Sequence, residues 1–157
     1  MTVDAQHAFA FQTGTWRVRH RKLKERLAGC TEWVDFDGTC RGWELLDGAA
    51  NADDHWLDDP NGAYRAATVR RMNPDTGRWS IWWIDQRLAE IGPPVHGGFD
   101  GGVGLFHGKD MLRGQAIDVR FIWSEIDKAS ARWEQAFSAD EGAGWETNWV
   151  MEFKREG

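Results

Sequence analysis

The chain has 157 residues, a length typical of one domain with a single sizeable core, here expected to span residues 1–157. Its 25 acidic and 19 basic residues give a net charge of −6, which argues against a surface that binds nucleic-acid phosphates. No stretch approaches the roughly 18 apolar residues that span a bilayer, and the first residues lack a signal-peptide pattern. We therefore expect a soluble, cytoplasmic protein with no nucleic-acid or membrane partner.

The composition stands out for 11 tryptophans and 18 glycines, against one tyrosine and four prolines. Glycines let strands bend and bulge, and large flat side chains fill the volume that such strands enclose. This combination favours a barrel or a sandwich. Cys30 and Cys40 form no CxxC pair and have no histidine nearby at metal-ligand spacing, so we expect free buried thiols, no disulfide and no metal.

The first segments predict a short helix or turn followed by a strand. Residues 5–13 can form a helical turn in which Phe9 and Phe11 plug one end of the fold. Residues 14–27 then alternate with period two, which is typical of a strand with one buried and one wet face. The buried face carries Trp16, Val18 and His20, and the wet face carries Arg17, Arg19 and Arg21.

The next segments predict a second strand and a polar loop. Residues 32–46 alternate in their first half, as a strand does. Residues 47–62 contain five aspartates and end in Pro60-Asn61-Gly62, which is typical of a loop with a tight turn. The aspartates and His55 are suitable metal ligands by type, but their spacing matches no known metal loop. We interpret them as solvated loop charge.

The second half of the chain predicts three hairpins and one long loop. Asn73–Gly77 has the residues of a hairpin turn between two strands. Residues 90–104 contain six glycines and two prolines, so we expect a mobile or functional loop there. Residues 103–126 and 131–155 each alternate about a turn. The eight to ten strands in this order predict an all-β, antiparallel, up-and-down barrel, which leaves no exposed edge strand.

The triplet Gly14-Thr15-Trp16 at the start of the first strand resembles the GxW signature of lipocalin-like (calycin) proteins. The resemblance implies that Trp16 closes one end of the barrel against a basic side chain, for which Arg155, Lys154 and Arg132 are candidates. The stretches ATVRRMNPDTGRWSIWWID, GGVGLFHG, IDVRFIWS, ARWEQAFS and WETNWVMEF extend the likeness over nearly the whole chain. They resemble an uncharacterised bacterial calycin-like family, a domain of unknown function, which brings no established reaction.

The same GTW triplet is similar to that of haem-binding nitrobindins. In that family the proximal histidine comes from the carboxyl-terminal part of the barrel. Here the last histidine is His107, with none in the final fifty residues. We therefore expect no haem and no other cofactor.

The later strands predict which side chains face the interior. Period two places Trp123 and Trp133 inward, opposite charged neighbours. For residues 79–86 both faces carry tryptophan, so the pattern leaves open whether the face with Trp83 and Asp85 or the face with Trp82 points inward. On the last strand the inward set is Trp145, Thr147, Trp149, Met151 and Phe153.

An eight-stranded barrel encloses room for one small ligand. The leading interpretation is an intracellular binding protein for a small apolar or aromatic molecule, gated by residues 49–59 and 92–104. Gln135 and Thr147 would fix a carbonyl or hydroxyl group of the ligand. The predicted ligand-binding residues are Trp83, Trp123, Trp133, Gln135, Thr147 and Trp149. The alternative is an interior filled by rings, with no pocket.

Two other functions remain open. His20 and Asp85 would transfer protons if the protein were a cofactor-independent isomerase, cyclase or hydrolase of a hydrophobic metabolite. A single inward histidine such as His20 is equally explained by a structural hydrogen bond. The third function is a filled barrel whose role is dimerisation, and a homodimer is compatible with all three.

Overall fold

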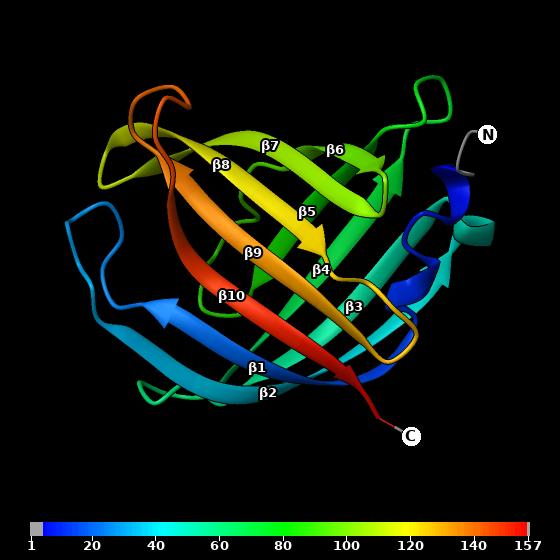
Figure 1. Cartoon of the computed structure of the whole chain (residues 1–157), viewed down its shortest axis with the longest axis horizontal. Coiled ribbons are helices and arrows are strands. Elements are labelled where there is room, and N and C mark those ends of the chain that lie inside the picture. The colour runs from blue at the N-terminus through cyan, green and yellow to red at the C-terminus, as the bar shows by residue number, and fades with distance from the viewer. Residues whose placement is uncertain (1–4, 157) are drawn as a thin grey trace.

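In the computed structural model, which describes residues 5–156, the chain forms ten antiparallel strands closed into a barrel (Figure 1). Each strand pairs with the next in sequence and the last pairs with the first, so the predicted all-β up-and-down barrel is confirmed. The strands are β1 (Gly14–Leu23), β2 (Trp33–Leu45), β3 (Ala50–Leu57), β4 (Tyr64–Met72), β5 (Trp79–Asp85), β6 (Val95–Asp100), β7 (Val103–Leu112), β8 (Gln115–Ser124), β9 (Ser130–Ser138) and β10 (Glu146–Arg155).

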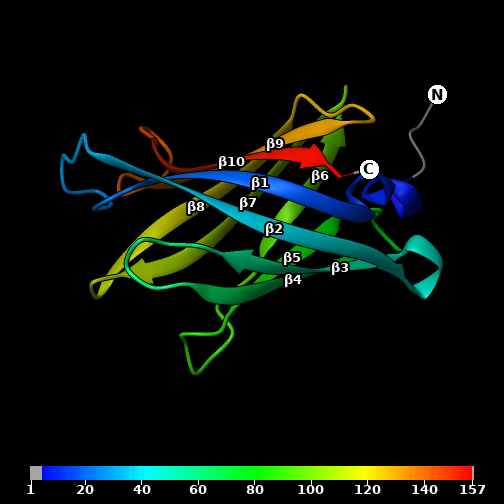
Figure 2. The same ribbon diagram turned by 90° about the horizontal axis from the view of Figure 1, so that it is seen from below.

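Short 3₁₀ turns account for the helical residues, η1 (Ala5–His7), η2 (Ala10–Gln12) and η3 (Leu46–Gly48). Within the described residues, none of these helices has the length and apolar character to cross a membrane. The predicted amino-terminal helix or turn is thus confirmed, as η1 and η2. Figure 2 shows both at one end of the barrel, beside the wall formed by β1 to β4.

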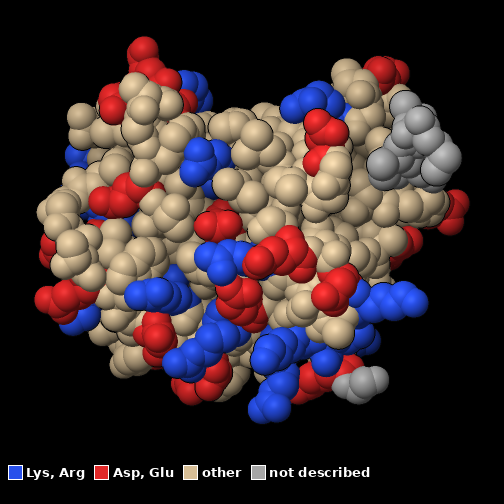
Figure 3. Space-filling model, in the orientation of Figure 1, with Lys and Arg blue, Asp and Glu red and all other residues tan. Residues whose placement is uncertain are grey.

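Strand β1 has the predicted two faces. Its inward side chains from Trp16 to His20 are buried, whereas Arg17, Arg19 and Arg21 are exposed. Arg19 lies 3.0 Å from the Asp37 carboxylate on β2, and Arg17 lies 3.6 Å from Glu156. Figure 3 shows such interleaved basic and acidic side chains where β1, β2 and β10 face the viewer. Exposed pairs add little stability, so inward packing holds this wall.

The amino-terminal turns plug one end of the barrel. Phe9 is 1% exposed. Its ring meets Trp79 and Phe99 edge-on, with centroids 4.9 and 5.0 Å apart. Phe11 packs edge-on against Trp123 at 5.3 Å. This closed end lies at the right in Figure 1, and the β1–β2 and β9–β10 connections lie at the opposite end, which we call the mouth.

Trp16 and Arg155 complete the closed end. The Trp16 indole N–H donates to the Gln12 carbonyl at 2.9 Å, and the Arg155 guanidinium lies 4.1 Å from the Trp16 ring centroid. Arg155 is therefore the basic partner among the three candidates. Gly14 has φ +119°, and a Cβ there would lie 2.5 Å from the Arg155 guanidinium. Both the backbone angle and the close approach require glycine at this position of the GTW triplet.

The polar tract 47–62 is a loop only in its last five residues, where the predicted tight turn is present, and the rest of this expectation is corrected. It contains η3 and β3, and β3 turns Asn51, Asp53 and His55 into the barrel with exposed fractions of 1–2%. The residues of β3 do alternate with period two, but the inward side chains are polar, so the sequence resembles a charged, solvent-exposed loop. Residues 90–104 likewise contain β6 and the start of β7. Neither segment predicted to gate the barrel is therefore a loop throughout.

The wall between β5 and β6 is short. Their ladder has three pairs and ends at Ile81 opposite Val95, whereas β5 continues to Asp85. The chain from residue 86 to 94 makes the connection around this gap. The inward face of β5 carries Trp79, Ile81, Trp83 and Asp85, which decides the orientation that the sequence left open.

A β-bulge at Asn148 reverses the predicted orientation at the start of β10. Trp149 pairs with Gln135 on the inward face, but Thr147 pairs with Ala136 on the outward face. The extra residue shifts the alternation by one position. Trp145 consequently lies outside the barrel, where Arg120 stacks 4.5 Å from its ring centroid. The inward placement of Thr147 and Trp145 is therefore corrected.

Candidate functional site

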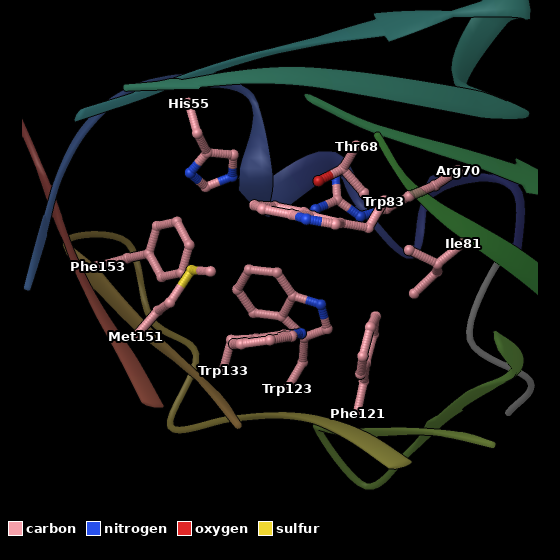
Figure 4. A pocket seen from close by; sticks show the side chains of 10 residues that line it. All are labelled: His55, Thr68, Arg70, Ile81, Trp83, Phe121, Trp123, Trp133, Met151 and Phe153. Atoms are coloured by element: carbon pink, nitrogen blue, oxygen red, sulfur yellow. The ribbon is translucent and has the colours of Figure 1, made fainter. Parts of the chain in front are cut away.

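A small cavity lies at the centre of the barrel. Its volume of about 20 Å³ is room for roughly one water molecule. Figure 4 shows the side chains of β3 to β5 on one side of this cavity facing those of β8 to β10. The lining residues are His55, Thr68, Arg70, Ile81, Trp83, Phe121, Trp123, Trp133, Met151 and Phe153.

Arg70, on the polar side of this inner cavity, belongs to a buried ion pair. The Arg70 guanidinium lies 2.7 Å from the Asp53 carboxylate, and both side chains are at most 3% exposed. The Thr68 backbone N–H and the Gln12 side chain also donate to Asp53, each at 3.0 Å. Burial opposes ionisation of Asp53, but Arg70 and His55 outweigh it and hold the carboxyl pKa below its usual range. The pair thus ties β3, β4 and the amino-terminal plug together.

Cys40, Asp53 and His55 place their ligand atoms within 4.8 Å of one another, a grouping that sequence spacing missed. The pairing of β2 with β3 sets Cys40 opposite His55. The grouping is not a nucleophilic triad, because Cys40 and Asp53 both contact the same nitrogen, Nε2 of His55, at 3.5 and 3.2 Å. Burial and Asp53 raise the thiol pKa of Cys40, which keeps it unreactive.

This cluster also makes a poor metal site. Asp53 is already neutralised by Arg70, whose positive charge would repel a cation. Gln12 donates to both the Cys40 sulfur and Asp53. The donors therefore hold one another in a structural network. Cys40 is buried as predicted, whereas Cys30 is only half-buried, and both are free thiols.

A larger cavity of about 260 Å³ lies on the mouth side of the first. Ile81, Trp83, Phe121 and Trp133 border both cavities. Leu88, Gly92 and Pro93, from the connection around the β5–β6 gap, line its outer part. The remaining lining residues are Lys22, Arg26, Asp85, Arg87, Val95, Lys109, Asp110, Val119, Gln135, Phe137 and Trp149. We call this space the outer cavity.

Four of the predicted ligand-binding residues meet at the outer cavity, namely Trp83, Trp133, Gln135 and Trp149. The Trp149 ring meets Trp83 and Trp133 nearly perpendicularly, with both centroid distances 5.3 Å. Trp123 lines only the inner cavity.

Thr147, on the outer face of β10, is not among the residues that line either cavity. The Gln135 amide instead donates to the buried Asn148 at 2.8 Å. Asn148, and not Thr147, is thus the residue of β10 that bonds to Gln135.

His20 faces inward as predicted but lines neither cavity. Its Nδ1 accepts a hydrogen bond from the Trp149 indole at 3.1 Å, and its ring stacks on Phe36 with centroids 4.7 Å apart. Nε2 faces the β2 backbone, because a Cβ on Gly38 would lie 3.0 Å from it. Burial, with His55 and Lys22 nearby, lowers the His20 pKa to about 2, so the ring stays neutral.

Asp85 does line the outer cavity, but it is bound to Arg87. The Arg87 side chain donates to both carboxylate oxygens, at 3.0 and 2.8 Å. Burial opposes ionisation of Asp85, but the bonds from Arg87 outweigh it and lower the carboxyl pKa. Asp85 is therefore an ionised ion-pair partner, and its hydrogen bonds do not join it to His20.

The sequence analysis missed the cations at the mouth, Lys22 and Arg26. Lys22 continues the inward series of Trp16, Val18 and His20, so the same period-two rule could have found it. Arg26 lies beyond the end of β1, in the connection to β2, where no periodicity applies. Both line the outer cavity.

Searches for related proteins find similar folds only. No family model and no curated protein matches the chain. The S-type phycobiliprotein lyase CPES from Guillardia theta is similar in structure, with a TM-score of 0.65 at 11% identity, over 99% of this chain and 94% of that one. Rv2717c from M. tuberculosis has a TM-score of 0.64 at 10% identity, over the full length of both chains. Both are lipocalin-like barrels, so this chain has the calycin-like fold.

Replacing Asp53 with Asn tests the buried ion pair. The change leaves Arg70 charged and buried without its partner, so we expect Asp53→Asn to lower the free energy of unfolding by about 3–5 kcal/mol. The matched control is Asp54→Asn on the outer face, which removes the same charge from an exposed pair with Arg65 and costs at most about 1 kcal/mol. Urea denaturation measures both variants. Equal losses would contradict the burial of Asp53 inside the barrel.

The pH dependence of stability tests the assignment of His20 as a neutral structural residue. The His20 pKa is depressed in the folded state, so below about pH 6.5 the unfolded chain binds a proton that the folded chain does not, and stability falls as the pH is lowered. Between pH 7 and 5.5 this amounts to about 1 kcal/mol. His20→Gln, which keeps an acceptor for Trp149, should lose that part of the dependence in urea denaturation. An unchanged dependence would show that His20 titrates normally when folded.

Proposed function

We propose that this protein binds a small apolar or aromatic molecule in the outer cavity. The observation that supports the proposal is the space of about 260 Å³ walled by Trp83, Trp133 and Trp149. Ligand pockets of proteins are concave and mostly apolar, and the smaller ones have volumes of about 300 Å³, close to that of the outer cavity. The indoles brace one another at right angles, so they offer a preformed aromatic wall.

The shape of the interior favours binding over a filled structural barrel. The closed half is occupied by the amino-terminal plug and by the Asp53 network, which leaves a space the size of a water molecule. The mouth half is bordered by large rings and is nevertheless open. Leu88 and Pro93, from the connection around the short β5–β6 ladder, line the outer part of this space.

Binding is also favoured over proton-transfer catalysis. A general base must reach the substrate and have a pKa near the working pH. His20 has its Nδ1 bonded to Trp149 and a pKa of about 2. Asp85 reaches the cavity, but Arg87 holds its carboxylate. An enzyme in this cavity would therefore lack the predicted acid and base pair.

The other parts of this proposal rest on the sequence alone. They are an intracellular location, membership of the uncharacterised bacterial family, a possible homodimer, and the absence of cofactor, nucleic-acid and membrane partners. The similar protein from Guillardia theta is a phycobiliprotein lyase, but at 11% identity the likeness supports the fold only.

The test uses the neutral fluorescent probe N-phenylnaphthylamine. We expect saturable binding that quenches tryptophan fluorescence, because the probe rings would lie against the indoles. Val119→Phe fills the outer cavity from β8 and should weaken binding by about tenfold or more. The control is Val150→Phe, on the outer face of β10, which should bind as the unmodified protein does. Equal affinity in all three proteins would contradict the proposed site.

A further inference from the structure

The outer cavity carries positive charge at its mouth that the described residues do not neutralise. We propose that the ligand is an anion, an apolar or aromatic body bearing a carboxylate, sulfonate or similar group, and that Arg26 and Lys22 bind this group at the mouth of the barrel. The inference rests on the proposed function, because it places the body of the same ligand among Trp83, Trp133 and Trp149.

Arg26 is the first part of this anion site. Its guanidinium lies 5.4 Å from the Phe137 ring centroid and 5.9 Å from that of Trp149, both of which line the outer cavity. Within the described chain it has no carboxylate partner, and burial lowers its pKa. The Arg26 side chain is half-buried, and removing part of a charge from water without a partner costs free energy. A guanidinium held there is suited to a bidentate contact with an anion from outside the protein.

Lys22 is the second part. Its ammonium group lies 4.2 Å from the Trp149 ring centroid and donates to the Tyr64 hydroxyl at 3.1 Å. No carboxylate of the described residues bonds to it. Trp149 thus contacts both cations and also walls the cavity, so one ligand can place its rings against the indole and its anionic group between Lys22 and Arg26.

The acidic residues near the mouth do not compensate for these two cations. Asp85 is held by Arg87, and Asp118 by Lys109. Asp110, Asp59 and Glu146 lie near the mouth as well, but they accept the backbone N–H groups of Met111, Asn61 and Leu27 respectively and form no ion pair with Lys22 or Arg26. The chain as a whole has a net charge of −6, so this excess of positive charge is a local feature of the cavity mouth. It favours an anionic ligand through short-range contacts, since the field of the whole protein opposes one.

A pair of probes with the same rings separates the charge from the apolar body. Anilinonaphthalene sulfonate has the ring system of N-phenylnaphthylamine with an added sulfonate. At pH 7 we expect the sulfonate probe to bind the protein about tenfold more tightly than the neutral one. Arg26→Gln and Lys22→Met should each weaken the sulfonate probe by roughly tenfold and leave the neutral probe within about twofold.

Two control variants remove the same charges from the outer surface far from the mouth. Arg41→Gln on β2 and Lys154→Met on β10 lie in exposed positions near the closed end. They should leave the affinity for both probes unchanged. Circular dichroism confirms that each variant is folded, and the two mouth variants provide independent readings of the same site.

The pH dependence gives a second reading of the Lys22 contact. Burial, Arg26 and Arg87 lower the Lys22 pKa to about 8, against the opposing effect of Asp59 and Asp85, and Tyr64 has its pKa raised to about 12 and does not titrate in this range. Lys22 is a cation below pH 8 and neutral above it. The affinity for the sulfonate probe should therefore fall between pH 7 and 9, whereas it should stay level for the neutral probe and in Lys22→Met.

The outcomes distinguish this inference from the proposed function. If both probes bind with equal affinity and Val119→Phe weakens both, the cavity binds apolar molecules and the anion site is refuted. The same holds if Arg26→Gln and Lys22→Met weaken both probes alike. If neither probe binds, the proposed function fails and this inference fails with it.

Discussion

The buried ion pair between Asp53 and Arg70 is the interaction on which the arrangement of this barrel depends. It joins β3 to β4 inside a closed sheet, and through Gln12 it also holds the amino-terminal turns in place. A buried ion pair often stabilises a fold no more than apolar residues of the same volume would. Removing one member of the pair is nevertheless strongly destabilising, because the other charge is left buried without a partner. The ion-pair network and the amino-terminal turns therefore fill the closed half of the interior, and space for a ligand remains only toward the mouth.

The cations at the two ends of the barrel have different partners, and this difference underlies the functional proposals. At the closed end Arg70 is matched by Asp53, and Arg155 is engaged by the carbonyls of Phe11 and Lys128 and by the Trp16 ring. At the mouth Lys22 and Arg26 rest on aromatic rings without a carboxylate. Rings stabilise a cation only partly, so the mouth is the place where an anionic ligand gains most.

The sequence predicted the barrel well because its evidence is local. Period-two alternation and turn residues define the strands, and the GTW triplet marks the closed end, where Trp16 lies as expected. Prediction failed where alternation carries an unusual residue type or is interrupted. Polar inward residues made β3 resemble a loop, and the bulge at Asn148 moved Thr147 to the outer face. A one-residue insertion in a ladder leaves no trace in composition or spacing.

The contacts that decide the site depend on register between strands. Nothing in the sequence indicates that Cys40 pairs with His55, or that the Trp149 indole bonds His20 and removes it from proton chemistry. Lys22 is an exception, since its inward position follows from the same alternation as Trp16. Arg26 lies in the connection between β1 and β2, outside any regular element. Its position over the Phe137 ring therefore could not be predicted from the alternation.

The most direct test of the central claim, that the outer cavity is the binding site, is nuclear magnetic resonance of the 11 tryptophan indoles in ¹⁵N-labelled protein. With N-phenylnaphthylamine added, the indole N–H resonances of Trp83, Trp133 and Trp149 should shift together and saturate, whereas those of Trp43, Trp56 and Trp145 on the outer surface should not move. Shifts confined to the outer tryptophans would place the ligand outside the barrel and contradict the account.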